Sequence, residues 1–497
     1  MAEDARQGVQ FPLVDGSRST TAAGRTVLAE AARAVDPRLA DRIAAERAWH
    51  QRYHEHVRDL VAAELRAAED GVQVPRTGLD ALYGRFEFHR DREVVGLADA
   101  ADAPVRTELR GVEVRGTGRP ETVLSVPYRG DQLTGEALLR QLDAWTAAGT
   151  VEPSFAEGIG RVVTHPEWLD LCDLTVVVLG AGSEMGPLAE LARWGATIVP
   201  IDLPRPALWE RVLATLRGGA GRAIVPVRRP AEDHELAEAA GVDLLTELPE
   251  AAAFLDTVPG PLVIGTYVYA DGGDNVRVSL AADALTVHVL RSRQDPVSLA
   301  ALLTPTDVYP VPPEVVRDAQ ERFARGGVLP AVARRATIGR GFAPNYRETI
   351  TTPAGATFGL ADTLVLQQGP NYALAKRLAR WRLRLARRDG VPVSANVAPA
   401  TRTRSVTSNR VLAAAYAGAH HFGVEVFEPA TSTTLMAALL VRDLRDPDAA
   451  GRPEASLPHS LGILADGAAH GGLWRIGYAP RSVLPLAAAL GLPRARR

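Results

Sequence analysis

The chain has 497 residues, which is enough for two or three domains, and 46% of them are hydrophobic, as in ordinary globular proteins. Its formal net charge of −3 gives no overall attraction to nucleic acid or to an anionic membrane, so we expect neither as a partner. The single cysteine, Cys172, excludes an intrachain disulfide and a cysteine metal cluster. Without a secretory signal or an apolar run of about 18 residues, we expect a cytoplasmic protein.

Lysine is almost absent from the chain, because 55 of its 56 basic residues are arginine. We attribute this bias, and the high alanine content, to a GC-rich genome. The single lysine, Lys376, is therefore informative, since arginine stands wherever else a positive charge is needed.

The first third of the chain has no long periodic pattern. Residues 1–24 are polar and irregular, so we expect a loose tail there. Apolar residues recur at helical spacing between 26 and 70, which predicts one or two amphipathic helices. Short strand-like pieces follow between about 80 and 130, and a further helix is expected over 134–148, ending at Gly149.

Beyond residue 166, apolar runs of strand length alternate with helical stretches. Thr175–Leu179 and Thr197–Ile201 are expected strands, followed by helices over 187–194 and 207–216. Strands that are apolar throughout are typical of a parallel sheet covered on both faces. Later strands are expected over 223–227 or 242–245, 262–269, 348–352 and 391–397, with a helix over 372–388. The sequence predicts an α/β, doubly wound, Rossmann-like sheet over 166–480, an N-terminal helical and α+β region over 25–165, and a tail over 481–497.

A glycine-rich loop follows the first of these strands. The segment VVVLGAGSEMG places Gly180, Gly182, Ser183 and Gly186 between a buried strand and a helix. Glycines there allow a tight turn, and free N–H groups at the start of the helix can bind a pyrophosphate. The pattern predicts a dinucleotide site.

The next strand ends in Asp202, 22 residues beyond Gly180. A carboxylate at this position can accept hydrogen bonds from both ribose hydroxyls and repels a 2′-phosphate. No lysine or arginine lies between Gly180 and Gly186, so NAD is favoured and NADP is the weaker candidate. Methyltransferases that use S-adenosylmethionine share this loop and acid, so the loop alone leaves both classes open.

Tyr372 and Lys376 lie at positions i and i+4, about 40° apart around a helix and therefore on one face. Tyrosine, with a pKa near 10, is a weak acid–base group at neutral pH. A neighbouring ammonium stabilises the phenolate, so we expect Lys376 to lower the pKa of Tyr372 toward the working range. A lone lysine would have a tyrosine at this spacing by chance about once in fifty cases. The pair is therefore a candidate catalytic unit.

The text from Tyr372 onward, YALAKRLARWRLRLARRDGVPVSANVAPATRT, resembles the catalytic helix, sixth strand and nicotinamide loop of the short-chain dehydrogenase/reductase family. The resemblance covers about residues 173–410. LGAGSEMG stands where the family has Thr-Gly-x-x-x-Gly-x-Gly, with Glu184 in place of the middle glycine. GTYVYADGG stands where the family has Asn-Asn-Ala-Gly.

The resemblance implies roles for four further residues. GVDLLTELPEAAAFLD is similar to the family's third strand and the helix after it, which implies that Asp243 lies near the adenine. TTPAG is similar to Ser-Ser-x-x-Gly, which implies that Thr352 takes the catalytic serine's role across a loop insertion. Pro399 and Thr403 correspond to the loop over the nicotinamide.

Together these features predict an NAD(H)-dependent alcohol dehydrogenase or ketone reductase. Tyr372 would exchange a proton with the substrate oxygen, Lys376 would hold the nicotinamide ribose, and Thr352 would bond the carbonyl oxygen. Hydride moves directly between nicotinamide and carbon, so no metal is expected. The alternatives are an S-adenosylmethionine-dependent methyltransferase and an NAD-binding regulatory protein without turnover.

The resemblance also implies a homodimer, in which the catalytic helix packs against its own copy. The helix over 372–388 carries six arginines, which would repel one another in such a dimer unless acids faced them. We expect these arginines to lie on a solvated surface.

Overall fold

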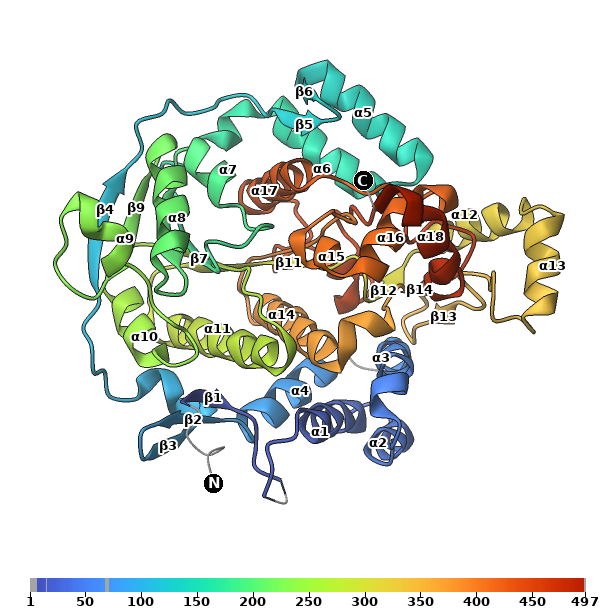
Figure 1. Cartoon of the computed structure of the whole chain (residues 1–497), viewed down its shortest axis with the longest axis horizontal. Helices are drawn as coiled ribbons and strands as arrows, with labels where there is room; N and C mark the ends of the chain where they lie inside the picture. The colour runs from blue at the N-terminus through green and yellow to red at the C-terminus, as the bar shows by residue number, and fades with distance from the viewer. Residues whose placement is uncertain (1–6, 15, 68–70, 496–497) are drawn as a thin grey trace.

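A computed structural model describes residues 7–14, 16–67 and 71–495 of the chain. Within them, a seven-stranded mixed sheet has the strand order β15-β11-β10-β7-β8-β9-β4 (Figure 1). Six neighbouring strands are parallel, and β4 pairs antiparallel with β9 at one edge. The strands are β4 (Arg110–Arg115), β7 (Thr175–Leu179), β8 (Thr197–Ile201), β9 (Arg222–Val227), β10 (Leu262–Thr266), β11 (Val297–Leu303) and β15 (Val393–Val397).

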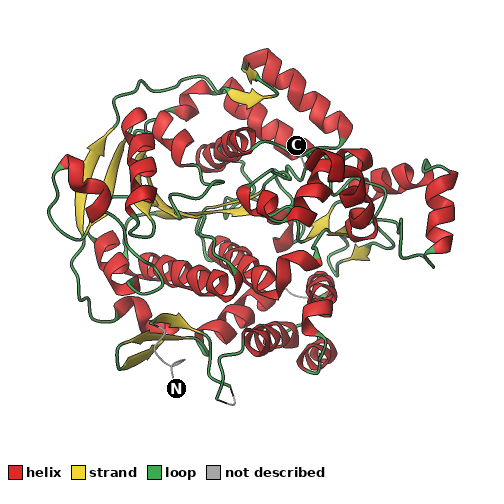
Figure 2. Cartoon of the chain, viewed as in Figure 1, coloured by secondary structure: helices red, strands yellow, loops and turns green. Residues whose placement is uncertain are grey.

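Helices cover both faces of this sheet, as Figure 2 shows. One face carries α7 (Leu188–Arg193), α8 (Pro206–Gly218) and α17 (Pro429–Arg445), and the other carries α10 (Leu248–Asp256), α11 (Gly272–Ser292) and α14 (Gly369–Arg388). In β7, Val176 and Val178 pack in the core with α7, α8 and α17, while Val177 and Leu179 pack in the core with α10, α11 and α14. Because successive strand side chains point to opposite faces, a strand between two helical layers must be apolar throughout.

An N-terminal region packs against the face formed by α11 and α14. It consists of α1 (Thr20–Arg33), α2 (Pro37–Ala44), α3 (Trp49–Arg66), α4 (Gln73–Tyr83) and a small sheet of β1 (Gly8–Gln10), β2 (Glu87–Arg90) and β3 (Glu93–Gly96). Its apolar residues share one core with those of α14. Arg384 of α14 forms a buried ion pair with Glu64 of α3 at 2.6 Å. The region is therefore an integral layer of the molecule.

The remaining elements cover the ends of the sheet. Between β4 and β7 lie β5 (Val126–Tyr128), β6 (Asp131–Leu133), α5 (Gly135–Ala148) and α6 (Pro153–Thr164), and after β9 comes α9 (Leu236–Ala239). Between β11 and α14 lie β12 (Val308–Val311), α12 (Pro313–Ala324), α13 (Val328–Ala336), β13 (Ile350–Thr351) and β14 (Thr357–Asp362). After β15 come α15 (Arg404–Ser408), α16 (Arg410–Gly418), α17 and α18 (Pro480–Ala495). Short 3-10 helices are η1 (Leu97–Asp102), η2 (Pro166–Leu169), η3 (Asp233–Glu235), η4 (Leu366–Gln368), η5 (Ala419–Phe422) and η6 (Ser460–Leu464).

The prediction of an α/β protein with a mostly parallel sheet after an N-terminal helical and small-sheet region is confirmed. Individual elements differ from the expectation. β11 was not among the expected strands, the third strand is β9 rather than 242–245, and only Ile350–Thr351 of 348–352 is a strand. Apolar residues between 26 and 70 belong to α1, α2 and α3.

Both expected tails contain ordered elements. In the first tail, β1 pairs with β2, and α1 begins at Thr20 with the Ser19 side chain accepting the N–H of Ala22 at 3.1 Å. The last helix, α18, occupies most of 481–497. Among the described residues, no helix has the length and apolarity that crossing a membrane requires.

The arginines of α14 do not form a solvated surface. Arg377, Arg380 and Arg384 are each 3% exposed. Both Arg377 and Arg380 form ion pairs with buried Asp307. The expectation was wrong because their acidic partners lie far away in the sequence, where helical spacing cannot reveal them.

Candidate functional site

The candidate site lies at the carboxyl edge of the sheet. β7, β8, β10, β11 and β15 are parallel, so the segments that follow them meet at this one edge. The glycine loop follows β7, Asp202 follows β8, Tyr267 follows β10, Thr304 follows β11 and Pro399 comes shortly after β15. The fold therefore gathers most of the expected site residues on one side.

The glycine loop makes a tight turn against the end of β10. Gly180 has a φ of +88°, and a Cβ added there would lie 2.9 Å from the backbone of Tyr267, so only glycine fits. The N–H of Ser183 donates to the carbonyl of Gly180 at 3.0 Å, and the N–H of Gly186 donates to that of Ser183 at 3.1 Å. These bonds close the turn between β7 and α7.

Asp202 is bonded directly to this loop. Its Oδ2 accepts the N–H of Gly182 at 2.7 Å, and its Oδ1 accepts the N–H of Leu203 at 2.7 Å. Burial raises the pKa of Asp202, while these two amide donors act in the opposite direction. Each carboxylate oxygen has two lone pairs, so the group keeps acceptor capacity for ribose hydroxyls.

Asp243 lies beside Asp202, although it does not follow a strand. The N–H of Val242 donates to the carbonyl of Asp202 at 2.9 Å, which brings the two segments together. Asp243 belongs to the turn before α10, where its Oδ1 accepts the N–H of Leu245 at 3.0 Å. The segments of Asp202 and Asp243 are thus joined through a turn before α10, because residues 242–245 form no strand.

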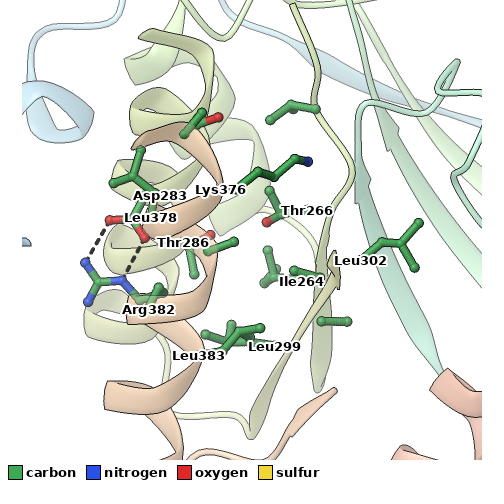
Figure 3. Close-up of a pocket in the computed structure, with 16 residues that line it drawn as sticks. Ile264, Thr266, Asp283, Thr286, Leu299, Leu302, Lys376, Leu378, Arg382 and Leu383 are labelled. Atoms are coloured by element: carbon green, nitrogen blue, oxygen red, sulfur yellow. Dashed lines mark hydrogen bonds and ion pairs between the residues drawn. The ribbon is translucent and has the colours of Figure 1, made fainter. Parts of the chain in front are cut away.

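Tyr372 and Lys376 share one face in the first turns of α14. The Nζ of Lys376 lies 5.5 Å from the centre of the Tyr372 ring. Figure 3 shows Lys376 extending from α14 toward the strand that carries Thr266, along a cavity of about 40 Å³. Asp283, which also lines this cavity, is bonded to Arg382 at 2.8 Å.

Lys376 has no acidic partner among the described residues, since no ion pair joins its Nζ to a carboxylate. Burial alone lowers its pKa to about 8. A lysine in this condition can gain or lose its proton near neutral pH.

Two polar side chains, Thr304 and Gln368, lie near enough to Tyr372 to lower the pKa of its phenol. Burial is the larger effect and raises the pKa of Tyr372, although Thr304 and Gln368 act in the opposite direction. The expectation that Lys376 lowers the pKa of Tyr372 is therefore wrong for the protein without ligands, because sequence spacing carries no information about desolvation. Tyr269, Tyr309 and Tyr416 also lie within electrostatic range of Tyr372.

Thr352 does not follow a strand of the seven-stranded sheet, since β13 and β14 belong to a separate sheet with β12. It is 4% exposed and belongs to the hairpin turn between β13 and β14, where its hydroxyl accepts the N–H of Ala356 at 3.2 Å. Thr304, directly after β11, lies near enough to Tyr372 to lower the pKa of its phenol. The sequence signal for Thr304 is the apolar run LAALL between Pro296 and Pro305, which marks a buried strand that ends just before Thr304.

The loop after β15 contacts the glycine loop. Pro399 is buried, and its carbonyl accepts the hydroxyl of Thr401 at 2.9 Å. Thr403 precedes α15, and the N–H of Arg404 donates to Oε2 of Glu184 at 2.8 Å. Glu184, which replaces the family's middle glycine, therefore joins the two loops between which the cofactor is expected.

Metal ligands are not gathered at this edge. Across the described residues, no three His, Cys, Asp or Glu side chains come together as a metal ion would need.

Comparison with known proteins adds no relative, because no protein-family model, curated protein or solved structure matches the chain.

Proposed function

We propose that this protein is an NAD(H)-dependent oxidoreductase of the short-chain dehydrogenase/reductase type, built on a doubly wound, Rossmann-like sheet. The strand order supports this proposal. From β7 the chain continues to β8 and β9 on one side, while β10, β11 and β15 extend the sheet on the other. Open α/β sheets bind ligands at the carboxyl ends of their strands where the order reverses in this way. The reversal lies between β7 and β10, beside the Gly180 loop.

The observation that carries the proposal is the grouping of Tyr372, Lys376 and Thr304 at the same sheet edge as the glycine loop. The glycine loop would hold the pyrophosphate, and Asp202 the adenosine ribose. NAD(H), when bound, supplies or accepts the hydride.

The chain's own residues favour carbonyl reduction. Since burial raises the pKa of Tyr372, its phenol is protonated at neutral pH and can donate a proton to a carbonyl oxygen. The Thr304 hydroxyl, beside Tyr372, can donate a hydrogen bond to that same oxygen. Lys376, with a pKa of about 8, is mostly positive at neutral pH and would stabilise the phenolate left behind. The substrate class we propose is an alcohol or a ketone.

Replacing the tyrosine tests this function. In Tyr372→Phe we expect the rate of NADH-dependent reduction, across a panel of ketones and aldehydes, to fall by about a thousandfold or more. NADH affinity, measured by calorimetry, should be nearly unchanged. The matched control is Tyr478→Phe, which removes a hydroxyl from a ring packed between Phe323 and Phe342 and should retain full turnover. Comparable turnover in Tyr372→Phe would rule out the assignment.

A second candidate is an NAD-binding protein without turnover, and the bond between Glu184 and Arg404 favours it. A carboxylate in the glycine loop repels a pyrophosphate and ties the loop to the segment after β15. This candidate predicts NADH binding with no turnover on the whole panel, in the wild-type protein and in Glu184→Gly alike.

A further inference from the structure

Residues 322–347 form a segment of one-sided charge, which we call the basic arm. It contains six arginines and no aspartate, glutamate or lysine. The segment begins in the last turn of α12, continues through α13 and ends before β13. The net charge of −3, from which we expect no membrane partner, averages over the whole chain and hides a segment with a charge of +6.

The basic arm is anchored at its two ends and stands out from the molecule between them. The ring of Tyr478 lies 5.6 Å from that of Phe323 and 5.1 Å from that of Phe342, so one aromatic residue holds both ends. Figure 1 shows α13, in yellow, at the outer edge of the molecule, beyond α12 and away from the seven-stranded sheet. Residues 335–340, which follow on from α13, are all exposed. The outer part of the arm is therefore presented to the solvent.

Most of the charge on the basic arm is not neutralised by the fold. Arg322 forms an ion pair with Asp318 at 2.8 Å, and Arg325 forms one with Glu321 at 3.0 Å, so the two arginines nearest α12 have acidic partners. Within the described part of the chain, no ion pair joins a carboxylate to the other four, which are Arg334, Arg335, Arg340 and Arg347. The outer arm thus carries four positive charges that are free to meet an anionic partner.

Exposed apolar side chains lie among these charges. Ile338 is 92% exposed, more than any other large hydrophobic residue that the structure describes, and Val332 of α13 is 56% exposed. Ile338 also has a φ of +52°, a left-handed conformation that a β-branched residue rarely adopts. The next N–H, that of Gly339, donates to the carbonyl of Arg334 at 2.8 Å and ends the helix. Glycine or asparagine is the usual residue in such a left-handed cap, so folding alone does not account for an isoleucine there.

We propose that the basic arm docks on the surface of an anionic lipid membrane, where its arginines bind the headgroups and Ile338 and Val332 enter the apolar boundary beneath them. Basic residues near such a surface attract anionic lipids, and neighbouring aliphatic side chains add buried apolar area. A nucleic acid would also attract the arginines, but its phosphate backbone offers no apolar phase to exposed aliphatic side chains. The combination of free charge and apolar exposure therefore favours the membrane.

Sedimentation of the full-length protein with lipid vesicles tests the role of the charges. We expect binding to vesicles of equal parts phosphatidylcholine and phosphatidylserine, no binding to phosphatidylcholine alone, and weaker binding as salt screens the charges. An arginine near an anionic surface contributes about fivefold in affinity, so Arg335→Gln combined with Arg340→Gln should lower the affinity about 25-fold. The matched control is Arg38→Gln combined with Arg119→Gln, which removes two exposed arginines outside the arm and should leave vesicle binding unchanged.

A second variant tests the apolar contact without changing the charge. Ile338→Asn suits the left-handed conformation, so the protein should fold as well as the wild type in urea unfolding. Its affinity for the anionic vesicles should fall about tenfold, because one aliphatic side chain no longer enters the boundary. The matched control is Leu13→Asn, which removes an apolar side chain that is 57% exposed outside the arm and should bind vesicles as the wild type does.

Three results would overturn the proposal. The first is no binding to the anionic vesicles, or equal binding to the neutral ones. The second is unchanged vesicle binding when Arg335 and Arg340 are both replaced. The third is tighter binding of a random-sequence DNA duplex than of the vesicles, with an affinity that Ile338→Asn leaves unchanged, which would assign the basic arm to nucleic acid instead.

Discussion

Lys376→Met should stabilise the folded protein, because it removes a partly buried ammonium that has no acidic partner among the described residues while keeping an unbranched side chain of similar length. Burial lowers the pKa of Lys376 from 10.5 to about 8, which corresponds to roughly 3 kcal/mol. Since the side chain is only partly buried, this value is an upper limit for the gain in free energy of unfolding. A functional residue that destabilises its own fold is common at active sites.

The sign of the pH dependence follows from the direction of the shift. Below pH 8 the lysine is protonated in both the folded and the unfolded protein, so the full penalty is present in the wild type. Between pH 8 and 10.5 the folded protein loses the proton first, so wild-type stability rises relative to Lys376→Met. The difference between the two proteins should therefore be largest near pH 7 and small above pH 10.

Urea unfolding at pH 7 and pH 9.5, followed by circular dichroism, measures this difference. The matched control is Arg325→Met, which removes an exposed cation bonded to Glu321 at 3.0 Å and should change stability by less than about 0.5 kcal/mol. Equal or lower stability of Lys376→Met at pH 7 would refute the reasoning, since it would mean that the ammonium is solvated or paired.

Four further substitutions test other parts of the molecule. Thr304→Val should lower kcat/KM about a hundredfold through loss of one donor, while Thr352→Val should leave it unchanged in the same turnover assay. Asp202→Asn should reduce the preference for NADH over NADPH about tenfold in calorimetric titrations, because the charge that repels a 2′-phosphate is gone. Glu64→Gln should lower the free energy of unfolding by about 3 kcal/mol, since it leaves the buried Arg384 without its ion-pair partner. An unchanged urea midpoint for that variant would contradict the role of this ion pair in holding α3 against α14.

Strands with a repeating local signal were predictable. β7 and β8 are apolar after their first residue because helices cover both faces, and the glycine loop and Asp202 follow from them by position alone. The apolar run in β11 carries the same strand signal. The catalytic hydroxyl role, however, is assigned to Thr352, because TTPAG is similar to a family motif and lies 20 residues before Tyr372. The segment between β11 and α14 contains helices and strands of its own, so a motif at a fixed distance before Tyr372 does not locate the end of β11, where Thr304 lies.

Features that depend on distant partners were not predictable. Arg384 and Glu64 are 320 residues apart, and Arg382 and Asp283 are 99 residues apart, so no helical spacing reveals their pairing. Desolvation is equally invisible in a sequence. The spacing of Lys376 and Tyr372 therefore predicts that they lie close together, but it does not predict that burial raises the pKa of Tyr372. Local pattern locates such residues, whereas packing decides their protonation.

The central claim is that NAD(H) binds at the carboxyl edge of the sheet, against the loop of Gly180. Calorimetric titration of the purified protein with NADH, and separately with S-adenosylmethionine, tests it most directly. We predict one NADH bound per chain, no binding of S-adenosylmethionine, and loss of NADH binding in Gly180→Ala, where the new Cβ would meet the backbone of Tyr267. Binding of S-adenosylmethionine in place of NADH, or NADH binding that survives Gly180→Ala unchanged, would contradict the account.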